Sequence, residues 1–240
     1  MKLLSLDFET TWTNPVNPKQ CRVLEIGCVL YDWENKKPLK MMSEFIFEED
    51  HPKSPPELVE LTGITDDMRK EHGIKLKEGL TALNFLMDQC DYVIAHNGND
   101  FDKVVLQSEI ERGSFSFVMN KPWIDSKTDI PYPSSVKSHK LTHLCTEVGE
   151  FVNPFSHRAL FDALAVLKLV RRYDLNEILE LAKQPTVKCI ASVGYERREL
   201  PKARGYYWDG ENKYWWKAMK EKQAYLEQDQ APFSIQIRGI

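Results

Sequence analysis

The sequence predicts an α/β protein in which helices cover a mixed sheet, followed by a small α+β module rich in aromatic residues. Three strand-like segments come first, over residues 2–8, 21–33 and 39–47, at the spacing of an antiparallel meander. Helical periods then alternate with one more buried strand, which is typical of a mixed sheet covered by helices. The composition changes after "LAKQPTVK", so we expect a domain of residues 1–184 and a module of residues 185–240.

The helices are predicted from their start signals, apolar periods and stops. Ser54, followed by two prolines, begins a helix that ends at Gly63. Apolar residues from Leu76 to Met87 repeat at a helical period, and the short apolar run Tyr92–Ala95 is a buried strand. Further helices are expected over residues 100–112, 139–149 and 157–174.

The C-terminal module is predicted to combine strands with one short helix. We expect a strand over Val187–Val193, a helix over Arg197–Arg204, and strands Tyr206–Trp208 and Tyr214–Trp216 paired around an Asp-Gly turn. Its aromatic side chains, if exposed beside Lys and Arg, can stack on nucleic-acid bases. A small module also needs large aromatics for its core, and strand alternation sends side chains to both faces. Contact with nucleic acid and docking to a partner protein, such as a polymerase, therefore both stay open.

Composition and cysteine usage indicate a soluble, cytoplasmic protein. The chain of 240 residues has 42% hydrophobic and 28% charged residues, and its start, "MKLLSLDFET", lacks a long apolar signal core. No apolar run approaches the length of a membrane span, so we expect no membrane association. The five cysteines are scattered and form no CxxC pair, which argues against a disulfide framework and a zinc site.

Net charge does not identify a partner. The chain carries −4 overall, but the residues from 185 onward have 10 Lys and Arg against 7 Asp and Glu. An acidic main domain binds nucleic acid poorly by charge alone. Metal ions held by clustered acids would reverse the local electrostatic field. The class of partner must therefore be inferred from the motifs and not from the net charge.

The first strand contains an unusual pair of acids. In "LLSLDFETT", Leu4, Leu6 and Phe8 alternate as the core face, which places Asp7 and Glu9 together on the opposite face. Two like charges at roughly 4–6 Å repel by a few kcal/mol in a partly buried setting. A cation between them would remove that cost.

Two more acids occur where burial is expected. Asp102 follows the strand Tyr92–Ala95 at the first turn of a helix, and Asp162 lies on a helix that is apolar nearly all round. A buried carboxylate must be neutralised, paired or bound to metal. Oxygen ligands suit Mg²⁺ or Mn²⁺, and Asp7, Glu9, Asp102 and Asp162 are candidates to hold two such ions about 4 Å apart. This is the arrangement for in-line displacement at a phosphodiester.

His157, five residues before Asp162, is the candidate general base for the attacking water. An imidazole has an ordinary pKa of about 6.5 and accepts a proton at mildly alkaline pH. Taken singly, each residue also has a structural interpretation: Asp7 and Glu9 as a solvated strand end, Asp102 as a helix-start acid, and His157 as a capping residue. Their joint occurrence favours the metal site.

The motifs resemble those of a known enzyme family. Asp-x-Glu (Asp7, Glu9), Asn-x₃-Phe-Asp (Asn97 to Asp102) and His-x₄-Asp (His157 to Asp162) occur in this order. They are similar to the three motifs of the DEDDh 3′–5′ exonucleases, the group of proofreading exonuclease subunits, RNase T and oligoribonuclease. The resemblance covers roughly residues 1–173. It implies an RNase H-like fold with a five-stranded mixed sheet, two divalent ions on the four acids, and His157 as general base. It also implies release of nucleoside 5′-monophosphates from a 3′ end.

Substrate contacts are expected close to these motifs. By resemblance, Thr10 and the backbone near Phe8 meet the terminal nucleotide, and Leu61 wedges against its base. His96 and Asn97, at the end of the buried strand, either touch substrate or close the turn. The family's first motif continues into a small turn, whereas here Thr11 runs into the proline-containing loop Trp12–Gln20.

Three functions follow from these observations. The leading one is a metal-dependent 3′–5′ exonuclease that acts on the 3′ ends of single-stranded DNA or RNA. The alternatives are a proofreading subunit that works only with a polymerase, and a module that grips 3′ ends without cutting them. The sequence leaves open the choice between DNA and RNA, the oligomeric state, and a role in repair, proofreading or degradation.

Overall fold

The structure, a computed structural model, describes residues 1–12, 16–133 and 136–239. The chain forms two compact units. Residues 1–126 and 152–170 make the first unit, and residues 127–151 and 171–240 make the second. This division differs from a single boundary near residue 184, which stays a prediction. Part of the loop Trp12–Gln20 lies outside the described residues.

The first unit contains the mixed five-stranded sheet that the sequence predicts. Its order is β3-β2-β1-β4-β5, with antiparallel pairs β1–β2 and β2–β3 and parallel pairs β1–β4 and β4–β5. The strands are β1 (Lys2–Thr10), β2 (Val23–Asp32), β3 (Lys37–Phe45), β4 (Tyr92–Ala95) and β5 (Trp123–Asp125). The residue pattern alone missed β5, because a run of only three residues gives no period to detect.

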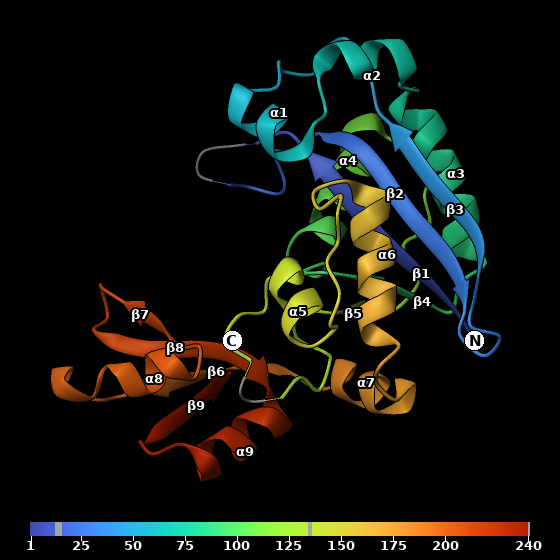
Figure 1. Cartoon of the computed structure of the whole chain (residues 1–240). Helices are drawn as coiled ribbons and strands as arrows, with labels where there is room; N and C mark the ends of the chain where they lie inside the picture. Colours follow the sequence, from blue (N-terminus) through green and yellow to red (C-terminus); the bar gives the residue numbers. More distant parts are fainter. Residues whose placement is uncertain (13–15, 134–135, 240) are drawn as a thin grey trace. The chain divides into compact units, whose positions relative to one another are not determined.

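Helices cover this sheet on both faces (Figure 1). On opposite faces lie α3 (Leu76–Asp88) and α6 (Ala159–Val170), and the first unit also contains α1 (Pro56–Thr62), α2 (Asp66–His72) and α4 (Asp102–Gly113). Gly63 ends α1 in the left-handed conformation with φ 70°, as its position after the apolar period predicts. The pattern missed α2, whose sequence "DDMRKEH" is polar on all sides and starts from the side-chain cap of Thr65.

The two faces of β1 pack differently: one lies in the hydrophobic core, and the other carries the candidate acids. Leu4, Leu6 and Phe8 pack in the main hydrophobic core, which α3 completes. The other face of β1 packs against α6, and there the Ser5 hydroxyl donates a hydrogen bond to the Ala163 carbonyl at 2.8 Å. Figure 1 shows α3 and α6 on opposite sides of the sheet. The alternation predicted for the first strand is therefore confirmed.

A glycine on β2 lets α6 approach the sheet closely. Gly27 lies opposite Asp7 in the β1–β2 register. A Cβ at Gly27 would lie 2.0 Å from the Leu160 nitrogen and 2.1 Å from the Ala159 carbonyl carbon. Only a residue without a side chain fits under the first turn of α6. This contact brings that helix beside the carboxyl group of Asp7.

The second unit contains an antiparallel sheet of order β7-β8-β6-β9. Its elements are α5 (Leu141–Glu147), α7 (Leu175–Ala182), β6 (Thr186–Ala191), the 3₁₀ turn η1 (Tyr195–Arg197), α8 (Glu199–Ala203), β7 (Tyr207–Asp209), β8 (Tyr214–Lys220), α9 (Glu221–Gln230) and β9 (Ile235–Gly239). The predicted hairpin, first strand and short helix are present, with shifted ends. Helices α7 and α9 and strand β9 were not predicted.

The core of the second unit lies between its sheet and the helices α8 and α9. It contains Cys189, Tyr206, Met219 and Phe233, with Ala224 contributed by α9. Residues before the sheet also join this unit, because the Lys220 ammonium lies 2.8 Å from the buried carboxylate of Asp129.

All five cysteines are buried thiols. Within the described residues, no helix combines the length and the apolar character needed to cross a membrane.

Candidate active site

Asp7 and Glu9 lie on the α6 face of β1, near the end of the strand. Both side chains are half-buried, and the β1–β2 register places them opposite Gly27 and Glu25. Phe8, between them, points into the core with 5% exposure. The two acids therefore share one surface, as the alternation of the first strand predicts.

Asp102 is the first residue of α4 and is 2% exposed. Its carboxylate accepts a hydrogen bond from the Phe8 amide at 3.1 Å, which ties the start of α4 to β1. The turn before α4 is held from β5, where Asp125 accepts from the amides of Asn97 at 2.9 Å and Asn99 at 3.2 Å. The parallel strands β4 and β5 thus position the third acid.

Asp162 lies in the first turn of α6, where it organises the loop before the helix. One carboxylate oxygen accepts from the Asn153 side-chain amide at 2.6 Å, and the other accepts from the His157 backbone amide at 2.9 Å. His157 has φ 63°, a left-handed conformation that a non-glycine residue adopts only when its surroundings hold it. The fold therefore brings the histidine and the fourth acid together.

Glu9, His157 and Asp162 form a group that could hold a metal ion. One ligand atom from each of the three lies within 4.8 Å of the others. Oxygen ligands with one imidazole suit a hard or borderline divalent cation. The two carboxylates and the ring nitrogen come from β1, the loop before α6 and α6 itself.

Burial raises the pKa values of all four acids, and the charges of neighbouring acids add to the rise. Burial is the largest cause for Asp7, whose pKa lies well above its ordinary range, and the charges of Asp102, Glu9 and Asp162 add to it. Burial also raises the pKa of Glu9 to about 8, with contributions from Asp162 and Glu25. The pKa of Asp102 is raised to about 8 by burial, against the opposing Phe8 amide.

The pKa of Asp162 is raised as well, mainly by burial, although the His157 amide opposes the rise. A set of acids that is costly to ionise without a counter-charge fits a divalent cation. The residues present therefore suit the metal that the sequence motifs imply.

A buried ion pair lies beside this cluster and was missed from the sequence. Arg158 donates to both oxygens of Glu25, at 3.0 and 2.9 Å, and the Ala159 amide donates to the same carboxylate at 3.1 Å. Glu25 is 1% exposed, and the Arg158 guanidinium lies 5.0 Å from the centre of the Phe45 ring. A glutamate inside the apolar run "VLEIGCV" was the available signal.

The expected substrate-contact residues lie at several places in the first unit. Thr10 ends β1 and is buried, whereas Leu61 on α1 is 43% exposed. The His96 ring nitrogen lies 2.9 Å from the Ser126 hydroxyl, and the Asn97 amide donates to Asp125. These contacts, one of them through the Asn97 backbone, hold the turn after β4. Contact of these two residues with substrate stays a prediction, as it does for Phe8, Thr10 and Leu61.

Comparisons with known proteins agree with this arrangement. A family model described as "RNase_T: Exonuclease" matches residues 4–170. The DNA polymerase III PolC-type of Mycoplasma genitalium is 30% identical over 155 residues, which are 61% of this chain and 10% of that polymerase. The chain thus spans about a tenth of that curated relative.

Solved exonuclease structures share the fold. The nuclease domain of 3′hExo, a DEDDh family member bound to rAMP, has a TM-score of 0.59 at 18% identity, covering 71% of this chain and 90% of that chain. E. coli exonuclease I in complex with a dT13 oligonucleotide has a TM-score of 0.59 at 17% identity, covering 80% of this chain and 48% of that chain. The expected RNase H-like fold and the resemblance to DEDDh enzymes are confirmed, and the chain belongs to the exonuclease family.

Proposed function

We propose that this chain is a two-metal 3′–5′ exonuclease that releases nucleoside 5′-monophosphates from single-stranded DNA or RNA. The observation that carries the proposal is the cluster of four acids with raised pKa values, with His157 beside Glu9 and Asp162. The rAMP bound by 3′hExo and the dT13 oligonucleotide bound by E. coli exonuclease I support a nucleotide chain as the substrate class.

In this proposal Asp7, Glu9, Asp102 and Asp162 hold two Mg²⁺ or Mn²⁺ ions. The bound ions would supply positive charge for the phosphate and for the departing oxygen and would acidify the attacking water. His157 accepts one proton from that water as its oxygen bonds to phosphorus, and the bond from phosphorus to the 3′ oxygen breaks. Asp162 positions His157 by accepting its backbone N–H.

Substrate positioning is assigned to residues around β1. Thr10 and the backbone near Phe8 hold the terminal nucleotide, Leu61 packs against its base, and His96 and Asn97 line the neighbouring turn. The amide of Phe8 donates to Asp102, which ties the backbone near Phe8 to the third acid of the candidate site. Because Leu61 is exposed, its side chain is accessible to a base of the substrate.

The test uses 5′-labelled single-stranded DNA and RNA of matched sequence, with Mg²⁺, Mn²⁺ or EDTA. A metal-dependent ladder that shortens from the 3′ end supports the proposal, and the faster substrate identifies the preferred nucleic acid. Asp7→Ala and Asp162→Ala should abolish turnover while leaving the fold intact. Full activity in either purified variant would contradict the proposal, and binding without any ladder would favour a module that grips 3′ ends.

A second candidate is a proofreading role beside a polymerase. The observation that favours this role is the similarity to the PolC-type DNA polymerase III, with which the chain aligns over 155 residues. In this case residues 185–240 are the candidate docking module for the polymerase, beside an exonuclease domain of residues 1–184. Co-purification with a replicative polymerase, and stimulation by it on mismatched primer ends, would distinguish this role from independent degradation.

A further inference from the structure

The aromatic side chains of the β7–β8 hairpin divide between the two faces of the second sheet. Trp208 pairs with Trp215, and Tyr207 pairs with Trp216 in the next register position. Residues paired directly across an antiparallel ladder share a face, and successive residues alternate. Trp215 packs against the core with α8 and α9. Tyr207 and Trp216 therefore lie on the opposite face.

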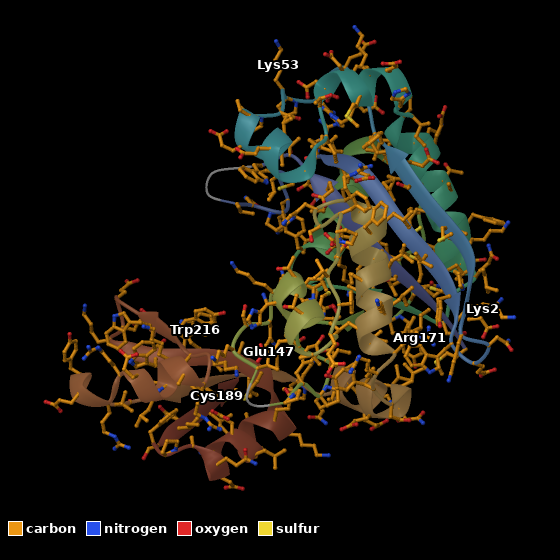
Figure 2. The ribbon with its side chains drawn as sticks, viewed as in Figure 1. Lys2, Lys53, Glu147, Arg171, Cys189 and Trp216 are labelled. Carbon is orange, nitrogen blue, oxygen red and sulfur yellow. The ribbon has the colours of Figure 1, made fainter. Side chains whose placement is uncertain are left out.

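This opposite face carries three aromatic rings around one lysine. The Lys188 ammonium lies 5.1 Å from the centre of the Tyr214 ring and 4.9 Å from that of the Trp216 ring, and it donates to the Tyr214 hydroxyl at 2.9 Å. The rings of Tyr207 and Trp216 lie 6.0 Å apart. We call Tyr207, Tyr214, Trp216 and Lys188 the aromatic face. Figure 2 labels Trp216 on β8 and Cys189 on β6, whose side chains belong to opposite faces.

The aromatic face lies outside the hydrophobic cluster that Tyr206 and Met219 help to form. Tyr207 is 65% exposed, and Tyr214 and Trp216 are half-buried, whereas Tyr206 and Met219 fill the core at 3% and 7% exposure. At the end of the sheet away from the hairpin, Lys220 forms an ion pair with Asp129. The exposed aromatics thus gather at the hairpin end, where a ligand can reach them.

The charges on this face suit a polyanion. Arg238 on β9 pairs directly with Lys188, so both cations lie on the same face. Asp209 pairs with Tyr214 and so lies on this face, where its carboxylate accepts hydrogen bonds from the amides of Glu211 and Asn212 and from the Asn212 side chain. The two cations outnumber this one acid. One of the three Lys188 N–H groups donates to Tyr214, and a phosphate oxygen can accept from another.

We propose that the aromatic face binds an unpaired nucleic-acid strand. Bases stack on the rings of Tyr207 and Trp216, and Lys188 with Arg238 contacts the phosphates between them. The Tyr207 and Trp216 rings lie 6.0 Å apart on one face of the sheet, and sheets that bind single-stranded RNA likewise stack bases on aromatic side chains. Stacking does not read the 2′-hydroxyl, so DNA and RNA both bind. This inference concerns the second unit and does not depend on the metal chemistry of the first.

The experiment measures binding of the full chain to circular oligo-dT and circular oligo-U by fluorescence anisotropy in EDTA. A circle has no 3′ end, so binding reports a contact other than the exonuclease site. We expect Tyr207→Ala and Trp216→Ala each to weaken binding about 5- to 100-fold. Lys188→Gln should reduce the salt slope of log K by about 0.7.

Matched controls come from aromatics of similar exposure on other surfaces. Trp208, 48% exposed, lies on the other face of the same hairpin, and Tyr225, 54% exposed, lies on α9. Trp208→Ala and Tyr225→Ala should bind like the wild type. If Trp216→Ala proves unfolded by its melting curve, Tyr207→Ala decides, because that side chain is mostly exposed.

Two results would overturn the proposal. One is a wild-type chain that degrades linear substrate with Mg²⁺ but binds neither circle at low salt. The other is equal weakening by the aromatic-face and control variants. Either result leaves the exonuclease proposal intact, whereas binding to circles without any degradation would contradict only the exonuclease proposal.

Discussion

Arg158 holds Glu25 through two hydrogen bonds, at 3.0 and 2.9 Å, and so joins the residue after His157 to the first part of β2. Glu25 lies opposite Glu9, and Arg158 lowers the pKa of Glu9 against the larger effects of burial and neighbouring acids. The pair therefore acts on the candidate site in two ways. It fixes the start of α6, and the Arg158 guanidinium supplies positive charge that acts on Glu9.

Arg158→Gln should impair activity through Glu9. Loss of the positive charge removes an influence that lowers the Glu9 pKa, so the acidic limb of the pH–rate profile should move to higher pH. We expect kcat to fall about tenfold or more, because the start of α6 loses its anchor. Arg158→Lys should restore part of both effects. A variant with reduced stability but an unshifted pH profile would limit the pair to a structural role.

The metal-free protein should become less stable as the pH rises through the range of the raised acid pKa values. For Glu9, with a pKa of about 8 in the folded chain against 4.5, the penalty is absent below about pH 4.5 and complete above about pH 8. Glu9→Gln should thus raise Tm by roughly 3–6 °C at pH 8 in EDTA and change it little at pH 4.5. Melting curves at both pH values check the sign, and a lower Tm of the variant at pH 8 would contradict it.

Divalent metal should stabilise the wild-type chain at pH 8. Ligand that binds only the folded state raises the free energy of unfolding by about 2.7 kcal/mol at 100 times its Kd. Asp7→Asn should reduce the rise in Tm produced by Mg²⁺ or Mn²⁺, since one of the acids is neutral. As a matched control, Asp91→Asn changes an exposed acid at the start of β4 and should leave the rise unchanged.

His157→Ala should separate chemistry from metal binding. Loss of a general base lowers kcat by about 10²- to 10⁴-fold, while the metal-induced rise in Tm should persist. The ring lies close enough to Glu9 and Asp162 to be a ligand, so the melting experiment distinguishes the two roles. Loss of the metal-induced rise would assign His157 to the metal instead.

Gly27→Ala should destabilise the first unit strongly. The added Cβ would meet backbone atoms of Leu160 and Ala159 at about 2 Å, and neither can move without shifting α6. Overpacking of this kind costs about 1–3 kcal/mol or more, and activity should fall with it because α6 carries Asp162. Gly239→Ala is the matched control, since nothing lies within 4 Å of its added Cβ. Equal stability of the two variants would contradict the close approach of α6.

The sequence predicted the first unit well wherever residues repeat at a clear period. Strand β1 and helix α3 carry alternating or helical apolar patterns, and the structure confirms both. Helix α9 was missed because "EKQAYLEQDQ" has almost no apolar face, and it is held instead by Ala224 in the core and by the pairing of Glu227 with Arg204. Strand β9 was missed because it depends on pairing with β6.

The four acids and His157 could be selected from sequence because their motifs combine residue type, order and position at element ends. The contacts that hold these residues in place could not be predicted from the sequence. Asp125 holds the turn before α4 from a distant strand, and Asn153 reaches Asp162 through a loop whose shape no local pattern specifies. Glu25 was visible as an acid within an apolar strand, but its partner Arg158 lies 133 residues away in the chain.

The route of the chain through the two units has a consequence for biosynthesis. Asp7, Glu9 and Asp102 belong to the stretch 1–126, whereas His157 and Asp162 arrive with residues 152–170, after the chain has supplied residues 127–151 to the other unit. A nascent chain that has emerged only to residue 126 carries three of the four proposed metal-binding acids and lacks His157. The growing polypeptide therefore has no complete set of the proposed catalytic residues until α6 has left the ribosome and docked. No single peptide cleavage can separate the two units either, because the backbone passes between them three times.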